Sequence, residues 1–141
     1  MKKSGTLRMA LGAFAVAALL VTSGVVSAGA ASGPKLTVTP STNLKNGETV
    51  KVSGTGFRKG DFVYVVECLV GAKSGAQCNE LSATPATINS KGEMPVTKFT
   101  VSTGSVGGGT CGTKPSNLKK CDVSVGNAQG TDSAVFPIVF K

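Results

Sequence analysis

Short runs of alternating apolar and polar residues, separated by glycine, asparagine and proline, fill the chain from residue 35 onward. A period of two is typical of half-buried β-strands, and closely spaced turn residues are typical of antiparallel sheets. The pattern predicts strands over residues 35–39, 48–53, 62–68, 84–88, 95–101, 122–125 and 134–140. Seven such strands predict an all-β fold, namely an immunoglobulin-like, seven-stranded antiparallel β-sandwich.

Strand 62–68 is apolar on both faces. Alternation places Val63 and Val65 on one face, and the other face carries Phe62, Tyr64, Val66 and Cys68. We expect such a strand to lie at the centre of its sheet, with something covering each side. A ligand could cover the second face, but we predict that the protein's own side chains do so.

Two other segments carry clear signals. Residues 102–120 are rich in glycine and contain Pro115, so we predict that they are the least structured part of the domain. Pro137 lacks a backbone N–H group, which confines the last strand to a sheet edge or a bulge.

The first 30 residues have the layout of a secretory signal peptide. Lys2, Lys3 and Arg8 precede an apolar run over residues 9–21, and small residues at 27–31 offer cleavage after Ala28, Ala30 or Ala31. The apolar run is shorter than the roughly 20 residues of a membrane span. We therefore predict a leader over residues 1–30 and a secreted, extracellular domain over residues 31–141 that has no membrane contact once the leader is removed.

Four cysteines in an exported chain of this size predict two disulfides. Three pairings are possible, and the order in the chain favours Cys68–Cys78 and Cys111–Cys121. A zinc site is the competing use of four cysteines, but it needs close pairs such as C-x-x-C, which the spacing does not provide. No metal is predicted.

The chemistry needed for catalysis is largely missing. The chain has no histidine, which rules out Ser-His-Asp and Cys-His arrangements. Its acidic residues are scattered among turns and strands, as solvated carboxylates usually are. We predict that the protein is not an enzyme, with no catalytic residue and no required cofactor.

The charge of the domain is modest. Removing the leader leaves 12 basic against 7 acidic residues, a net charge of +5. Lys114, Lys119 and Lys120 form one local basic group, which could bind a polyanion weakly. The other basic residues are scattered and are predicted to be surface charges.

Several motifs together resemble the neocarzinostatin family, the apoproteins of enediyne antitumour chromoproteins secreted by actinomycetes. They are LTVTP at residues 36–40, VKVSGTGF at 50–57, the pair Cys68 and Cys78 followed by Asn79, FTV at 99–101 and CDVSVGN at 121–127. The resemblance covers nearly the whole predicted domain. It implies a seven-stranded sandwich with two disulfide-tied ribbons and a cleft between them.

The resemblance also implies a function. The protein would be a monomeric carrier that shelters a non-covalent enediyne-type chromophore, associated with antibiotic or antimicrobial activity. DNA would be the target of the released chromophore, so that the protein contacts DNA only indirectly or weakly. Carried over by alignment, the ligand-binding residues are Val70, Ala76, Ala83, Asp122, Ser124 and Gly126.

The chain departs from the family pattern in the predicted pocket. Val70 and Ala83 stand where the best-known members place a tryptophan and a phenylalanine, and the domain is basic where carriers are typically acidic. Stacking on aromatic side chains holds much of a polycyclic ligand. The alternative hypothesis is therefore an extracellular immunoglobulin-like interaction module that has lost the chromophore pocket.

Overall fold

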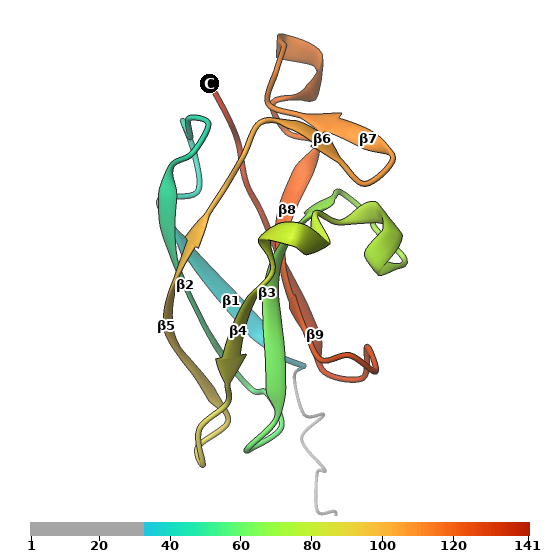
Figure 1. Ribbon diagram of the computed structural model, residues 1–141. Coiled ribbons are helices and arrows are strands. Elements are labelled where there is room, and N and C mark those ends of the chain that lie inside the picture. Colours follow the sequence, from blue (N-terminus) through green and yellow to red (C-terminus); the bar gives the residue numbers. More distant parts are fainter. Residues whose placement is uncertain (1–32) are drawn as a thin grey trace, which may run out of the picture. The chain divides into compact units, whose positions relative to one another are not determined.

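A computed structural model describes residues 33–141, which form nine strands and three short 3₁₀ turns (Figure 1). The strands are β1 (Lys35–Thr39), β2 (Thr49–Thr55), β3 (Phe62–Leu69), β4 (Thr84–Thr87), β5 (Glu93–Thr100), β6 (Gly104–Val106), β7 (Gly109–Cys111), β8 (Cys121–Gly126) and β9 (Ser133–Pro137). The 3₁₀ turns are η1 (Gly75–Gln77), η2 (Glu80–Ser82) and η3 (Pro115–Asn117). The predicted signal peptide lies outside the described residues. Within them, no helix has the length and hydrophobicity needed to span a membrane.

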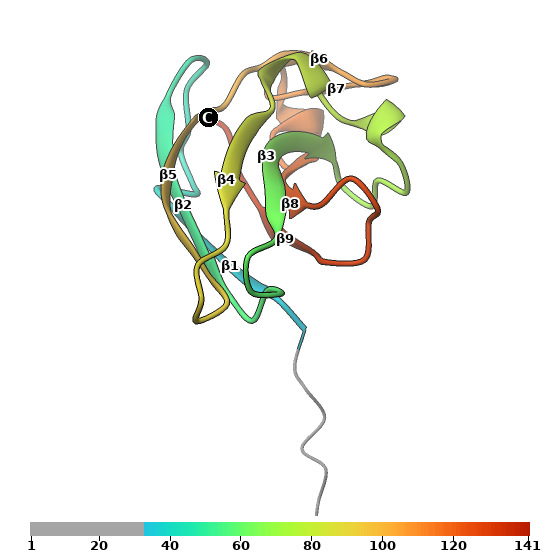
Figure 2. The same ribbon diagram turned by 60° about the horizontal axis from the view of Figure 1, so that its bottom comes forward.

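Two antiparallel sheets pack face to face, as the alternating pattern predicted. One sheet has the strand order β1-β2-β5 and the other the order β4-β3-β8-β9. Figures 1 and 2 show the two sheets as separate layers. The predicted all-β, immunoglobulin-like sandwich of seven main strands is confirmed, and β6 and β7 add a separate two-stranded ribbon.

Valine side chains supply much of the core between the layers. Val50 and Val52 of β2 face Val63 and Val65 of β3, and all four are completely buried. Burying a valine side chain contributes about 1.5–3 kcal/mol. The alternation that predicted these strands is therefore also what holds the two sheets together.

Both disulfides have the pairing that the chain order favoured. Cys68 is bonded to Cys78 and Cys111 to Cys121, and the partners are ten residues apart in each case. Closing a loop of this size stabilises the fold by roughly 2–3 kcal/mol, because it restricts the unfolded chain.

The segment 102–120 is more ordered than predicted. It contains the ribbon β6–β7 and the turn η3, and all of its ladder partners lie within the segment itself. The strands are only three residues long, and glycine occupies the turn between them, so the segment lacks the alternation that would reveal strands in a sequence.

The last strand is shorter than predicted and lies at a sheet edge, as Pro137 required. Ile138 still donates its N–H to the carbonyl of Cys121 in β8 at 3.3 Å, and beyond it the chain leaves the ladder. The N–H of Val139 then donates to the carbonyl of Ser41, and the N–H of Phe140 donates to that of Leu118. Ile138 and Phe140 nevertheless remain buried in the core.

Candidate functional site

The four-stranded sheet has one face on the core and one open face. In the register of β3 with β8, Tyr64 lies opposite Gly126, Val66 opposite Ser124 and Cys68 opposite Asp122. Residues opposite each other in an antiparallel ladder project from the same face. Because Val65 is in the core, its neighbours Tyr64 and Val66 project outward.

The expectation that the protein's own side chains cover this face is wrong. Phe62 is 49% exposed and Tyr64 is 41% exposed. The four-stranded sheet is an outer layer, and no third layer packs on it among the described residues. The second apolar face of strand 62–68 is therefore open toward solvent at Phe62 and Tyr64, whereas Val66 is half-buried and Cys68 is buried.

Two loops rise beside this face and enclose a cleft. Figure 2 shows the segment after β3 and the β8–β9 loop projecting on the side away from β1, β2 and β5. The cleft has a volume of about 720 Å³, and small-molecule sites typically measure about 300–1,000 Å³. Its walls come from Ala72–Gly75, Cys78, Glu80 and Ala83 on one side, and from Asn127–Gly130, Ser133 and Ala134 on the other.

The floor of the cleft is apolar at its centre. Tyr64 and Val66 of β3 and Val135 of β9 line it, together with the first disulfide. The ring of Phe62 packs edge to face against the ring of Tyr64, with centroids 5.2 Å apart and planes at 90°. Such a pair contributes about 0.5–1.5 kcal/mol beyond area burial.

Polar side chains line mainly the walls of the cleft, including Ser74 on one side and Asn127, Gln129 and Ser133 on the other. Lys73 and Glu80 are exposed on the wall that follows β3, and Ser124 lies on the floor. Asp122 belongs to the same sheet face, beside Cys68, but it is buried and outside the cleft lining. Desolvation by burial raises the pKa of the Asp122 carboxyl group.

Hydrogen bonds of Asn127 and Asp132 fix the loop between β8 and β9, which forms one wall of the cleft. The side-chain amide of Asn127 donates to Asp61 Oδ2 at 2.8 Å and to the Thr131 hydroxyl at 3.1 Å. Its Oδ1 accepts the N–H of Thr131 at 3.0 Å. Asp132 accepts the backbone N–H of Arg58 at 2.7 Å. The loop is thus fixed to the β2–β3 connection.

The opposite wall belongs to the first cysteine loop, residues 68–78, and rests on the β6–β7 ribbon and on the residue before β8. The N–H of Val70 donates to the carbonyl of Lys120 at 2.9 Å. A Cβ atom added to Gly107 would lie 2.6 Å from the carbonyl oxygen of Ala76, so the β6–β7 ribbon and the first cysteine loop touch backbone to backbone. The cleft wall at residues 72–78 is therefore supported by β6–β7.

The six ligand-binding residues predicted by alignment fall into two groups. Ala83, Ser124 and Gly126 line the cleft, whereas Val70, Ala76 and Asp122 do not. Val70 and Ala76 are exposed at the surface of the first cysteine loop.

Sequence reasoning did not assign several cleft residues, above all Tyr64, Val66 and the loop Asn127–Gly130. The alternation in strand 62–68 already placed Tyr64 and Val66 on one face with Cys68. The sequence predicts a turn over residues 126–130 between the last two strands, but it carries no signal that this turn forms a wall of a cleft.

Fold and site together define a class, the two-disulfide β-sandwich with a ligand-sized cleft on its open sheet face. The family model of the neocarzinostatin family matches residues 36–140, and the chain belongs to that family. Macromomycin of Streptomyces macromomyceticus is 30% identical over 106 residues, which cover 72% of this chain and 73% of macromomycin.

Solved structures agree with this assignment. A macromomycin structure matches with a TM-score of 0.60 and 30% identity, covering 77% of this chain and all of that one. The solution conformation of apokedarcidin matches with a TM-score of 0.54 and 28% identity, covering 78% of this chain and all of apokedarcidin.

Proposed function

We propose that the protein is a secreted, monomeric carrier that binds a small apolar, enediyne-type chromophore in the cleft and protects it. The observation that carries this proposal is the open, apolar face of the four-stranded sheet beneath two fixed loops. Family membership supports the carrier role. The leader over residues 1–30 and the extracellular location belong to the same proposal.

In this chain, the floor of the cleft would provide most of the contacts with the guest. The side walls offer Ala83 and the backbone of the first cysteine loop, which provide little aromatic surface. Tyr64 supplies the aromatic contact from the floor, and Val66 and Val135 supply aliphatic contact beside it. A planar, apolar guest lying on this floor would bury the exposed parts of these three side chains.

Protection follows from exclusion of water and of reactive side chains. A guest between the walls faces backbone, aliphatic groups, a disulfide, and hydroxyl and amide side chains, and it meets no free thiol among the described residues. The only charged side chains of the lining, Lys73 and Glu80, stand at the exposed rim. The protein would act as a container without catalytic chemistry, and DNA would be reached by the released chromophore.

The apolar floor favours this function over the interaction module that has lost its pocket, because a module needs no ligand-sized cleft. Lys114, Lys119 and Lys120 are all exposed and could add weak contact with DNA. Replacing all three with alanine tests that secondary role, since salt-sensitive retention on DNA should then fall. Unchanged retention would remove it.

Tyr64 offers a direct test of binding, because the chain has one tyrosine and no tryptophan. Its intrinsic fluorescence therefore reports on the floor of the cleft alone. Titration with naphthoate-like or enediyne-type compounds should change this emission to saturation. Emission that stays constant up to the solubility limit of every such compound, after correction for absorbance, would contradict the proposal.

A further inference from the structure

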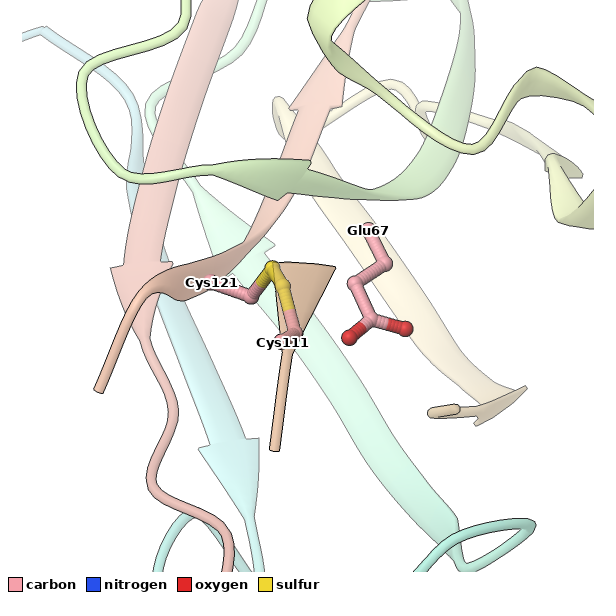
Figure 3. Close-up of side chains that lie close together, drawn as sticks. All are labelled: Glu67, Cys111 and Cys121. Carbon is pink, nitrogen blue, oxygen red and sulfur yellow. A yellow bond between two sulfur atoms is a disulfide. The ribbon is translucent and has the colours of Figure 1, made fainter. Parts of the chain in front are cut away.

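A carboxyl group is buried against the second disulfide. Glu67 of β3 is completely buried, as is Cys111, and Cys121 is 1% exposed. A carboxylate oxygen of Glu67 and the two sulfur atoms lie within 4.8 Å of one another. Figure 3 shows the carboxyl group of Glu67 beside the Cys111–Cys121 bond.

Only one of the two oxygens of this carboxyl group is satisfied. Oε2 accepts the backbone N–H of Ser102 at 2.9 Å and the Ser102 hydroxyl at 3.4 Å. Oε1 is buried without a hydrogen-bond partner among the residues that the structure describes. A buried polar atom without a partner is costly, and more so when it carries charge.

The surroundings of Glu67 favour its neutral form. Burial raises the pKa of its carboxyl group, although the two hydrogen bonds from Ser102 act in the opposite direction. The other titratable side chains at the site are Cys111 and Cys121, and their sulfurs are bonded to each other. Within residues 33–141, no basic side chain forms an ion pair with Glu67.

Reduction of the disulfide would change the surroundings of the Glu67 carboxyl group. Bonded sulfurs carry no proton, whereas two thiols bring two S–H donors to the same place. A thiol that donates to Oε1 would stabilise the carboxylate form of Glu67. We propose that Glu67 is the proton-exchanging partner of the Cys111–Cys121 disulfide and makes the reduction of this bond pH-dependent.

The reaction needs an external dithiol as reductant. One of its thiolates attacks a cysteine sulfur, and the electron pair of the broken S–S bond goes to the other sulfur. That sulfur takes the proton of the Glu67 carboxyl group. The second thiol of the reductant displaces the first cysteine, which takes a proton from water, and the reductant leaves as a cyclic disulfide.

The position of this disulfide connects it with the cleft. Cys111 ends β7, and the β6–β7 ribbon supports the cysteine loop that forms one cleft wall. Leu69 of β3 also packs against Gly109 of the ribbon. Reduction of Cys111–Cys121 would thus release the support of that wall, while leaving the first disulfide in place.

The test is the redox equilibrium of the folded protein with dithiothreitol, measured at several pH values by alkylation and mass spectrometry of each cysteine pair. Exchange between two dithiols takes up no net proton, so pH dependence must come from another group. The constant for reducing Cys111–Cys121 should rise with pH by up to about tenfold per unit where Glu67 titrates. In Glu67→Gln it should be flat below about pH 8.

Two controls accompany this experiment. The Cys68–Cys78 pair should respond equally in the parent protein and in Glu67→Gln, because Glu67 points to the other sheet face. Asp122→Asn removes a second desolvated carboxyl group and should leave the pH dependence at Cys111–Cys121 intact. Equal pH dependence at Cys111–Cys121 in the parent protein and in Glu67→Gln would overturn the proposal.

If Glu67→Gln does not fold, a second measurement tests the same proposal. Carbon-13 NMR of the Glu67 carboxyl group in the unaltered protein gives its pKa before and after reduction. The proposal requires a lower pKa in the dithiol form, because a thiol then donates to the carboxylate. An identical pKa in both forms would contradict it.

Discussion

At the scale of single residues, two acidic side chains depart from the usual behaviour of surface carboxylates. Glu67 faces the core and Asp122 faces the outer side of the same sheet, and burial raises the pKa of both. Glu67 is the more consequential of the two, because one of its oxygens has no partner among the described residues.

Stability should therefore depend on pH through Glu67. Its pKa is raised above the ordinary value of 4.5, so the folded state holds this proton more tightly than the unfolded state. The contribution to stability is fully present below that ordinary value and is lost as pH rises through the raised pKa.

We expect the free energy of unfolding to fall with rising pH in this window and the fall to be smaller in Glu67→Gln. Urea unfolding of both proteins at a series of pH values measures the difference. Identical pH slopes for the two proteins would show that Glu67 titrates normally.

Tyr64 should carry a measurable share of guest binding. Replacing it with alanine removes the aromatic contact on the cleft floor and should weaken binding by roughly two- to tenfold, the equivalent of one aromatic pair. Calorimetry measures the change. Val96→Ala is a matched control, because Val96 is an exposed apolar residue of the other sheet. An equal loss in both variants would argue against a specific role for Tyr64.

At the scale of elements, the walls of the cleft depend on a few backbone and side-chain contacts. Asn127→Ala removes three hydrogen bonds that fix the β8–β9 loop. We expect a loss of about 1–3 kcal/mol in stability, together with faster amide exchange in residues 127–131. Unchanged exchange in the loop would mean that these hydrogen bonds do not hold it.

The contact between the β6–β7 ribbon and the first cysteine loop can be tested at Gly107. This residue has φ of 51°, and an added Cβ atom would meet backbone atoms at 2.6 Å. Gly107→Ala should push the β6–β7 ribbon away from the first cysteine loop and weaken guest binding. The left-handed backbone alone should lower the free energy of unfolding by at least about 1–2 kcal/mol. Gly108→Ala is the control, since an added Cβ there meets nothing within 4 Å. Equal effects of the two substitutions would refute this account of the contact.

The same elements show what a sequence can reveal. Alternation located β1 to β5, β8 and β9, because each has one face buried or, in β4 and β9, partly buried against the core. It could not reveal β6 and β7, which are short, rich in glycine and paired only with each other. It also could not decide what covers the outer face of β3, since an apolar residue looks the same whether a protein layer, a ligand or solvent lies above it.

The candidate site was predictable in part for a related reason. Ser124 and Gly126 line the cleft because they lie on the outer face of β8 opposite Val66 and Tyr64, whereas Asp122, on the same face, lies beyond the cleft lining. Val70 and Ala76 lie in an irregular loop, where the direction of a side chain depends on local turns such as η1. Tyr64 was visible in the pattern, but its exposure depended on the absence of a third layer.

At the scale of the whole molecule, the residues that stabilise the fold differ from those that line the proposed cleft. The core between the sheets and the two disulfides stabilise the fold, and the outer face of one sheet carries the proposed binding cleft. Glu67 lies where these two functions meet, between the core and the ribbon that supports the cleft wall. A change at the second disulfide could therefore reach the guest without unfolding the sandwich.

The central claim is that the open face of the four-stranded sheet binds a small apolar molecule. Backbone amide NMR during titration with such a molecule tests it most directly. The account predicts saturable shifts at Val66, Ser124 and residues 127–130, with the sheet β1-β2-β5 unaffected. Shifts confined to β1-β2-β5, or no shifts at saturating ligand, would contradict it.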